Sequence, residues 1–188
     1  YDDGDNANLL RVIDRRKGLP VALGILCIHV ARAWGSVIDG TAFPSHFLLR
    51  LVEGNKFLYL DPFDSLRGMD DAAVQALFVQ MHGAAARFDQ AYLQPVSDRS
   101  VLLRLQNNIK LRAHQAGEIK RALQIAERMV MLAPALGELR LDVAGLLAEA
   151  GMMRSAMTTL EAVSNDSGLE RLHAEAQKRL LSLRSRLN

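Results

Sequence analysis

Cysteine, aromatic residues and net charge are all scarce in this sequence. Cys27 is the only cysteine among 188 residues, which excludes an internal disulfide or a zinc site of several thiolates and is compatible with a reducing cytoplasm. Aromatic residues make up 5% and the formal net charge is +2, with no block of Lys and Arg of the kind that binds nucleic acid. The longest mainly apolar run, residues 19–31, is too short to cross a bilayer.

These absences narrow the classes of function. We expect a cytoplasmic protein with no nucleic-acid partner, no membrane partner and no cofactor. The five histidines are scattered, with no pair at the i, i+4 spacing, so we also expect no metal site. The remaining partner class is a protein or a peptide, and the oligomeric state stays open. Because the chain begins with Tyr1 rather than Met, we expect it to be a fragment or a processed chain.

The composition and its change along the chain indicate two domains. With 49% hydrophobic and 23% charged residues, the chain resembles an ordinary globular protein, and its length suits one large domain or two small ones. After residue 94 the pattern changes from mixed helix and strand signals to continuous amphipathic helix. We therefore predict an α+β domain over residues 1–94 and an all-α domain over residues 95–188.

The predicted α+β domain has one central helix and a small antiparallel sheet. Pro20 suits the first turn of a helix, and the segment 20–34 is apolar on nearly every side, so this helix should be buried. Gly and Asn within residues 53–56 predict a hairpin turn. The predicted strands are residues 37–43, 46–52 and 57–61. In this hairpin His46 and Asp61 fall on one face of the sheet, within hydrogen-bonding reach.

The order of these residues resembles the core of the transglutaminase-like (papain-related) superfamily. In that core a Gly-x-Cys begins the helix, a His begins one strand and an Asp ends the next. On this pattern Gly18 takes the place of the glycine, and His46 and Asp61 take the places of the general base and its orienting carboxylate. Pro20 stands where the cysteine nucleophile would be. The resemblance therefore implies a vestigial catalytic dyad, His46 and Asp61, without a nucleophile.

The second domain has an internal repeat. Offsetting the sequence by 34 residues pairs Leu105 with Leu139, Ile109 with Val143, Ala116 with Ala150 and Gly117 with Gly151. A helix-turn-helix unit of this length is the tetratricopeptide signature. We predict tetratricopeptide-like repeats followed by a C-terminal capping helix.

Three segments together with these repeats resemble the bacterial SirB family, whose members are named as regulators of sirC expression. The segments are residues 14–23, 43–47 and 102–110. This family also carries a proline at the nucleophile position. The resemblance implies a truncated transglutaminase-like core followed by tetratricopeptide-like repeats, and it implies a fold more than a reaction.

Three functions remain open for this arrangement. The leading interpretation is a non-catalytic module for protein interaction or regulation, because proline offers no nucleophile. The alternative is a hydrolase or acyltransferase that uses His46 and Asp61 with water or a substrate group as nucleophile. A sensor of a small ligand in the same cleft is the third. Cys27 is a weak substitute, since a thiol in an apolar helix should be buried and unreactive.

The predicted repeats offer a second candidate site. In tetratricopeptide proteins the first helix of each unit lines a concave face, and polar and small residues on such a face suit peptide recognition. By this resemblance the candidate peptide-binding face comprises Arg104, Asn107, Leu111, His114, Gln115, Glu138, Leu141 and Glu149.

Overall fold

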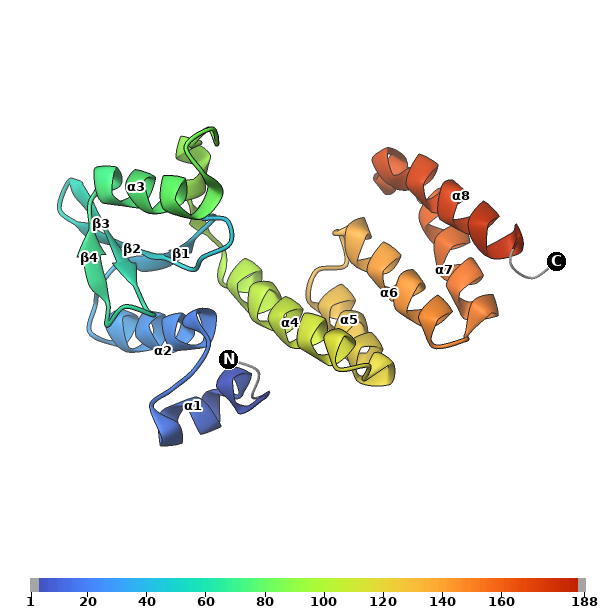
Figure 1. The fold of residues 1–188 in the computed structure, drawn as a ribbon, viewed down its shortest axis with the longest axis horizontal. Coiled ribbons are helices and arrows are strands. Elements are labelled where there is room, and N and C mark those ends of the chain that lie inside the picture. Colours follow the sequence, from blue (N-terminus) through green and yellow to red (C-terminus); the bar gives the residue numbers. More distant parts are fainter. Residues whose placement is uncertain (1–3, 186–188) are drawn as a thin grey trace. The chain divides into compact units, whose positions relative to one another are not determined.

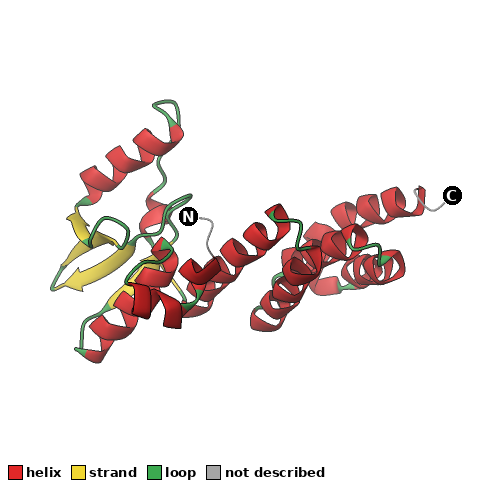
Figure 2. Ribbon diagram, turned by 60° about the horizontal axis from the view of Figure 1, so that its bottom comes forward, coloured by secondary structure: helices red, strands yellow, loops and turns green. Residues whose placement is uncertain are grey.

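The computed structural model describes residues 4–185. The chain divides into two compact units, Tyr1–Leu105 and Gln106–Asn188. The first unit combines a small sheet with helices, whereas the described residues of the second unit form helices and turns (Figure 2). The predicted α+β class is therefore confirmed.

In the first unit, α2 and α3 lie against the sheet, whereas α1 packs against α2 and the first 3-10 helix (Figure 1). The helical segments are Gly4–Ala7, α1 (Leu9–Arg15), α2 (Pro20–Ala33), α3 (Asp71–His82) and the 3-10 turn Gln90–Leu93. Pro20 begins α2 as predicted, because proline fits the first turn, where a backbone donor has no partner within the helix.

The sheet is fully antiparallel, in the order β4-β3-β2-β1-β5. Its strands are β1 (Ile38–Thr41), β2 (Leu49–Glu53), β3 (Lys56–Asp61), β4 (Arg67–Met69) and β5 (Pro95–Val96). The predicted hairpin joins β2 to β3, with Glu53 paired to Lys56. Gly54 has a φ of +60°, a conformation that glycine adopts without steric cost. The short strands β4 and β5 were not predicted.

The predicted strand 46–52 is three residues too long at its start. β2 begins only at Leu49, and His46 lies in the preceding bend. Pro44 has no backbone N–H for the sheet, and Ser45 adopts a left-handed conformation, so the chain cannot continue the strand there. His46 is therefore a loop residue, and the loop must be held by other contacts.

The two faces of the sheet are covered by different helices, with α2 on one side and α3 on the other (Figure 1). Strand residues alternate between the faces. On the side of α2, a Cβ atom at Gly24 would overlap the Phe47 ring and lie 3.4 Å from a methyl group of Leu49. On the opposite side, Leu48 and Tyr59 share a buried cluster with Val74 and Phe78 of α3.

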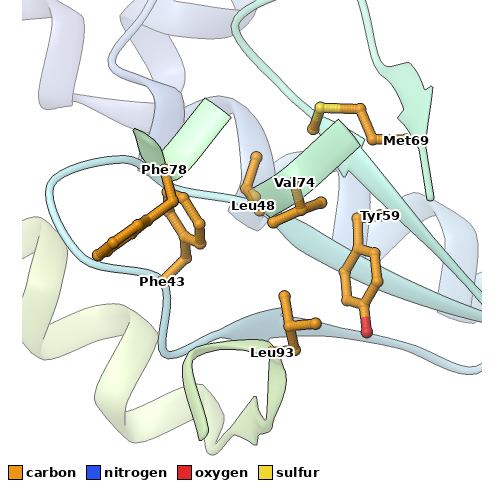
Figure 3. Close-up of a cluster of buried hydrophobic side chains, with 7 residues drawn as sticks. All are labelled: Phe43, Leu48, Tyr59, Met69, Val74, Phe78 and Leu93. Carbon is orange, nitrogen blue, oxygen red and sulfur yellow. The ribbon is translucent and has the colours of Figure 1, made fainter. Parts of the chain in front are cut away.

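That second face carries a buried cluster shown in Figure 3. Its members come from the loop between β1 and β2, from β3 and β4, from α3 and from the 3-10 turn before β5: Phe43, Leu48, Tyr59, Met69, Val74, Phe78 and Leu93. The Phe43 and Phe78 rings meet edge to face, with centroids 6.2 Å apart. The cluster fixes both ends of the segment that contains His46, because Phe43 precedes that residue and Leu48 follows it.

The division between the units falls inside α4 (Asp98–Gln115), between Leu105 and Gln106, later than the predicted boundary after residue 94. Side chains from the start of α4 belong to the first unit. Arg32 of α2 donates to the Asp98 carboxylate at 2.7 Å, and Val101 is buried at a position where it closely approaches Gly40 of β1.

The second unit contains antiparallel neighbours packed in chain order. α5 packs against α6, α6 against α7, and α7 against α8. The elements after α4 are α5 (Ile119–Leu132), α6 (Gly137–Glu149), α7 (Met153–Asn165), the 3-10 turn Ser167–Leu169 and α8 (Glu170–Ser185). Across residues 4–185, no helix combines the length and apolar character that a membrane span requires.

Candidate functional site

The structure brings His46 and Asp61 together at the end of β3. The Nε2 atom of His46 lies 2.8 Å from Oδ2 of Asp61, and the two side chains are 18% and 11% exposed. The other carboxylate oxygen, Oδ1, accepts a 2.8 Å hydrogen bond from the backbone N–H of Phe63. One carboxylate thus orients the imidazole and fixes the backbone that leaves β3. A general base with its orienting carboxylate has this geometry, and so does a hydrogen bond that only stabilises the fold.

His46 also closes a strained turn. Its backbone N–H donates to the Pro44 carbonyl at 2.7 Å, which makes a three-residue γ-turn centred on Ser45. Ser45 has a φ of +61°, in the left-handed region that residues other than glycine rarely adopt. A backbone of this kind costs about 1–3 kcal/mol, so it persists only where its surroundings hold it.

Arg104 of α4 holds this turn. Its Nη1 donates to the Phe43 carbonyl at 2.9 Å and its Nη2 to the His46 carbonyl at 2.6 Å, so one guanidinium joins both ends of the turn. The guanidinium carbon lies 5.4 Å from the centroid of the Phe47 ring. Burial lowers the pKa of Arg104. We expected Arg104 on the peptide-binding face of the repeats, but its guanidinium binds two carbonyl groups of the His46 turn in the first unit.

Phe47 anchors the residue next to His46. Its ring is only 2% exposed. A Cβ atom at Gly24 of α2 would overlap this ring, and one at Gly40 of β1 would lie 3.0 Å from its Cζ atom. The two glycines therefore leave the space that the Phe47 ring fills between α2 and the sheet. In the sequence, the sign of this close packing is a glycine inside the predicted helix and another inside a predicted strand.

Cys27, the only cysteine in the sequence, lies in surroundings that do not favour a thiolate. Pro20 is the first residue of α2. Cys27 lies further along the same helix, and burial raises the pKa of its thiol, whereas a nucleophilic cysteine needs a lowered pKa. We expected Cys27 to be buried, but it is only partly so. The end of α2 is open to solvent, with Val30 54% and Trp34 87% exposed, so this helix is not buried on every side.

The second unit has a groove of about 430 Å³ between side chains of α4, α6 and α8. Five of the eight residues assigned to the peptide-binding face line it: Asn107, Leu111, His114, Leu141 and Glu149. Gln115 and Glu138 do not line it. Glu138 instead forms an ion pair with Arg171 of α8, with Nη2 of the arginine 2.7 Å from Oε1 of the glutamate.

Sequence reasoning missed the other half of the groove lining, which comprises Lys110, Asp142, Gly145, Leu146 and Arg179. A signal for two of these was present, because Leu111, Gly145 and Arg179 follow one another at the same 34-residue offset. They are equivalent positions of every second helix, α4, α6 and α8, and all three line the groove. Within the described part of the chain, no three His, Cys, Asp or Glu side chains gather as a metal site would require.

The chain is similar to UPF0162 proteins of several bacteria. The chain is 34% identical to a UPF0162 protein of Xylella fastidiosa over 137 residues, which cover 71% of this chain and 49% of that protein. It is 31% identical to a UPF0162 protein of Pseudomonas aeruginosa over 129 residues, covering 69% of this chain and 47% of that protein. The chain thus spans about half the length of these curated relatives.

A shorter match reaches beyond bacteria. Human F-box only protein 21 is 38% identical over 64 residues, which cover 34% of this chain and 10% of that protein. No solved structure matches the chain significantly. Residues 1–107 match the family model of the transglutaminase-like superfamily, and this stretch contains α2, the sheet and the His46–Asp61 pair. The chain therefore belongs to the transglutaminase-like superfamily.

Proposed function

We propose that this chain is a non-catalytic member of its superfamily that acts as a protein-interaction or regulatory module. The observation that carries the proposal is Pro20 at the first turn of α2, where the sequence pattern of the superfamily enzymes has its nucleophile. Proline has no nucleophilic group, so the His46 imidazole has no side chain to activate at that position.

The remaining contacts are consistent with a structural role for the dyad. Asp61 holds His46 with one oxygen and the Phe63 backbone with the other, so the pair ties the loop before β2 to the loop after β3. The raised pKa of the Cys27 thiol argues against this cysteine as a replacement nucleophile.

The helical unit supplies the surface that an interaction module needs. Its helices α4 to α7 form two pairs related by the 34-residue offset, and α8 follows them, which suits a short tetratricopeptide-like array. Polar, charged and aliphatic side chains line its groove, as expected of a site that binds a peptide segment.

One observation favours a second candidate, a hydrolase or acyltransferase that uses the dyad with water or a substrate group as nucleophile. The turn at Ser45 is strained, and Arg104 holds both of its ends. Backbone strain of this kind is common at active sites, where it places a side chain for reaction.

A turnover screen separates the two candidates. The unmodified chain and a His46→Ala variant would be incubated with libraries of peptides, amides and esters, with Arg121→Ala on α5 as the surface control. We expect no turnover above the rate in buffer from any of the three. The non-catalytic proposal would be overturned if the unmodified chain and Arg121→Ala both turn over a substrate and a folded His46→Ala variant does not.

A further inference from the structure

A cavity of about 460 Å³ lies in the first unit, at the loop that leads into α2. Its lining includes Gly18 and Leu19, the two residues before Pro20, and Phe63 from the loop after β3. The backbone N–H of Phe63 donates to Asp61, so the cavity borders the loop that this carboxylate holds. A volume of several hundred Å³ is typical of a pocket for a small molecule.

The charged side chains that line this cavity are all cationic. They belong to three successive residues, Arg15, Arg16 and Lys17, and none of the described lining residues is acidic. Nη1 of Arg15 lies 3.4 Å from Oδ2 of Asp5, so this cation is paired. Within residues 4–185, the side chains of Arg16 and Lys17 have no ion pair or hydrogen bond. Two of the three positive charges are therefore open to a ligand.

Arg16 occupies a backbone position at which glycine is the usual residue. It directly follows α1 and has a φ of +52°, in the left-handed region. Glycine adopts this conformation without steric cost, whereas a residue with a side chain is strained there. Arg16 is also exposed, so burial does not explain its side chain. The chain thus carries a strained arginine where the cavity is the feature that its side chain borders.

Other strained residues lie in the neighbouring loops. Across residues 4–185, the non-glycine residues with a left-handed backbone are Arg16, Ser45, Ser65 and Leu66. Ser45 lies in the loop that carries the dyad histidine, and the N–H of Leu66 donates to the Asp61 carbonyl at 2.8 Å. Backbone strain of this kind clusters at active sites and ligand clamps. Its distribution agrees with a ligand site in this part of the fold.

The loop that carries the cations is fixed by contacts within the first unit. The N–H of Leu19 donates to the Asn6 carbonyl at 2.8 Å. Gly18 packs closely on buried Val12, because a Cβ atom at Gly18 would lie 2.7 Å from a Val12 methyl group. A preformed site loses less free energy to ordering when its ligand binds.

The lining matches a doubly charged anion with a compact apolar body. Two cations without partners suit a head group that carries two negative charges, and a guanidinium group binds phosphate oxygens in a bidentate geometry. Leu19, Leu23 and Phe63 supply apolar surface in the same cavity. Apolar walls with a few polar groups that orient the ligand are typical of small-molecule pockets.

We propose that this cavity binds a small phosphate monoester. The phosphate group contacts Arg16 and Lys17, and the apolar body of the ligand contacts Leu23 and Phe63. This inference goes beyond the proposed interaction function, because it assigns a ligand to the first unit and does not depend on the groove of the second.

NMR titration of the full chain with phenylphosphonate, a stable analogue of a phosphate monoester, tests the assignment. We expect saturable shifts of the amide signals of residues 16–19 and Phe63, and weaker binding as salt screens the contacts. Methylphosphonate lacks the ring and should bind at least about fivefold more weakly. Benzylammonium has the ring with the opposite charge and should not bind. No saturable binding of phenylphosphonate, or equal binding of either control probe, would overturn the assignment.

The variant Arg16→Gly separates a ligand contact from a structural role. Glycine relieves the left-handed backbone, so this variant should unfold at the same or a higher urea concentration, yet bind phenylphosphonate about threefold to tenfold more weakly. Lys17→Gln should weaken binding by a similar factor. Lys56→Gln changes an exposed lysine of β3 outside the cavity and should bind within about twofold of the unmodified chain. Unchanged affinity in both Arg16→Gly and Lys17→Gln would overturn the assignment.

Two further outcomes separate this inference from its alternatives. A phosphotyrosyl peptide presents a similar head group and ring, and binding about tenfold tighter than that of phenylphosphonate would overturn the small-molecule assignment in favour of a protein ligand. Failure of phenylphosphonate to bind would leave the non-catalytic proposal intact. Turnover that depends on His46 would overturn the non-catalytic proposal without changing the titration.

Discussion

Replacing Arg104 with alanine should loosen the turn that carries His46. The variant loses two hydrogen bonds from a charged donor, to the carbonyls of Phe43 and His46, each worth about 1.5–3 kcal/mol. Relaxation of the left-handed Ser45 backbone returns about 1–3 kcal/mol. At the middle of these ranges, about 4.5 kcal/mol is lost and about 2 kcal/mol is returned, which predicts a loss of about 2.5 kcal/mol in the free energy of unfolding of the first unit.

Urea unfolding followed through the amide NMR signals of the first unit measures this loss. Arg104→Lys should fall between the alanine variant and the unmodified chain, because an ammonium group lacks the planar fork that reaches both carbonyls. Arg121→Ala removes an exposed pair with Glu118 and should change the unfolding free energy by less than about 1 kcal/mol. An Arg104→Ala variant within about 0.5 kcal/mol of the unmodified chain, with the His46 amide signal unshifted, would refute the assigned role.

The same glycine-to-alanine change should have opposite signs in two helices. Gly24→Ala should lower the free energy of unfolding by about 1–3 kcal/mol, because the new methyl group overlaps the Phe47 ring. Gly145→Ala should raise the free energy of unfolding by about 0.5–1 kcal/mol, because alanine favours a helix interior and no atom opposes its methyl group. Urea unfolding that changes in the same direction for both glycine variants would contradict this explanation. Asp61→Asn should destabilise the first unit by about 1–2 kcal/mol through its weakened bond to His46, and an unchanged unfolding midpoint would argue against that bond. Burial raises the pKa of the Cys27 thiol, so iodoacetamide should label the native chain more slowly than free glutathione at pH 8 and accelerate at more alkaline pH; rapid stoichiometric labelling at neutral pH would revive a thiol enzyme.

Local signals in the sequence predicted much of the first unit. Proline at the first turn located the start of α2 at Pro20, and the predicted end at residue 34 is one residue beyond the observed end. The Gly-Asn turn gave the β2–β3 hairpin, whose register brings Asp61 near the loop that holds His46. The start of α2 and the hairpin turn depend on residues that are close together in the sequence, so they can be predicted without knowing the fold.

Long-range features were not readable in this way. Arg104 contacts residues about sixty positions earlier, and its helical position alone gave no sign that its guanidinium would serve the first unit. His46 was predicted to lie in a strand because a mainly apolar run, residues 47–52, follows it, but Pro44 and the left-handed Ser45 end the strand pairing before it. Gly145 lies in the interior of a helix, and its place in the groove lining depends on side chains of α4 and α8 that are distant in the sequence.

Quantitative affinity capture from cell extract, with proteins identified by mass spectrometry, tests the central claim most directly. Three baits would be compared: the unmodified chain, His46→Ala and Gly145→Leu. If the chain acts through the groove and the dyad has no catalytic role, His46→Ala retains the partners of the unmodified chain and Gly145→Leu loses them. Partners lost by a folded His46→Ala variant and retained by Gly145→Leu would place the function at the dyad and contradict the account.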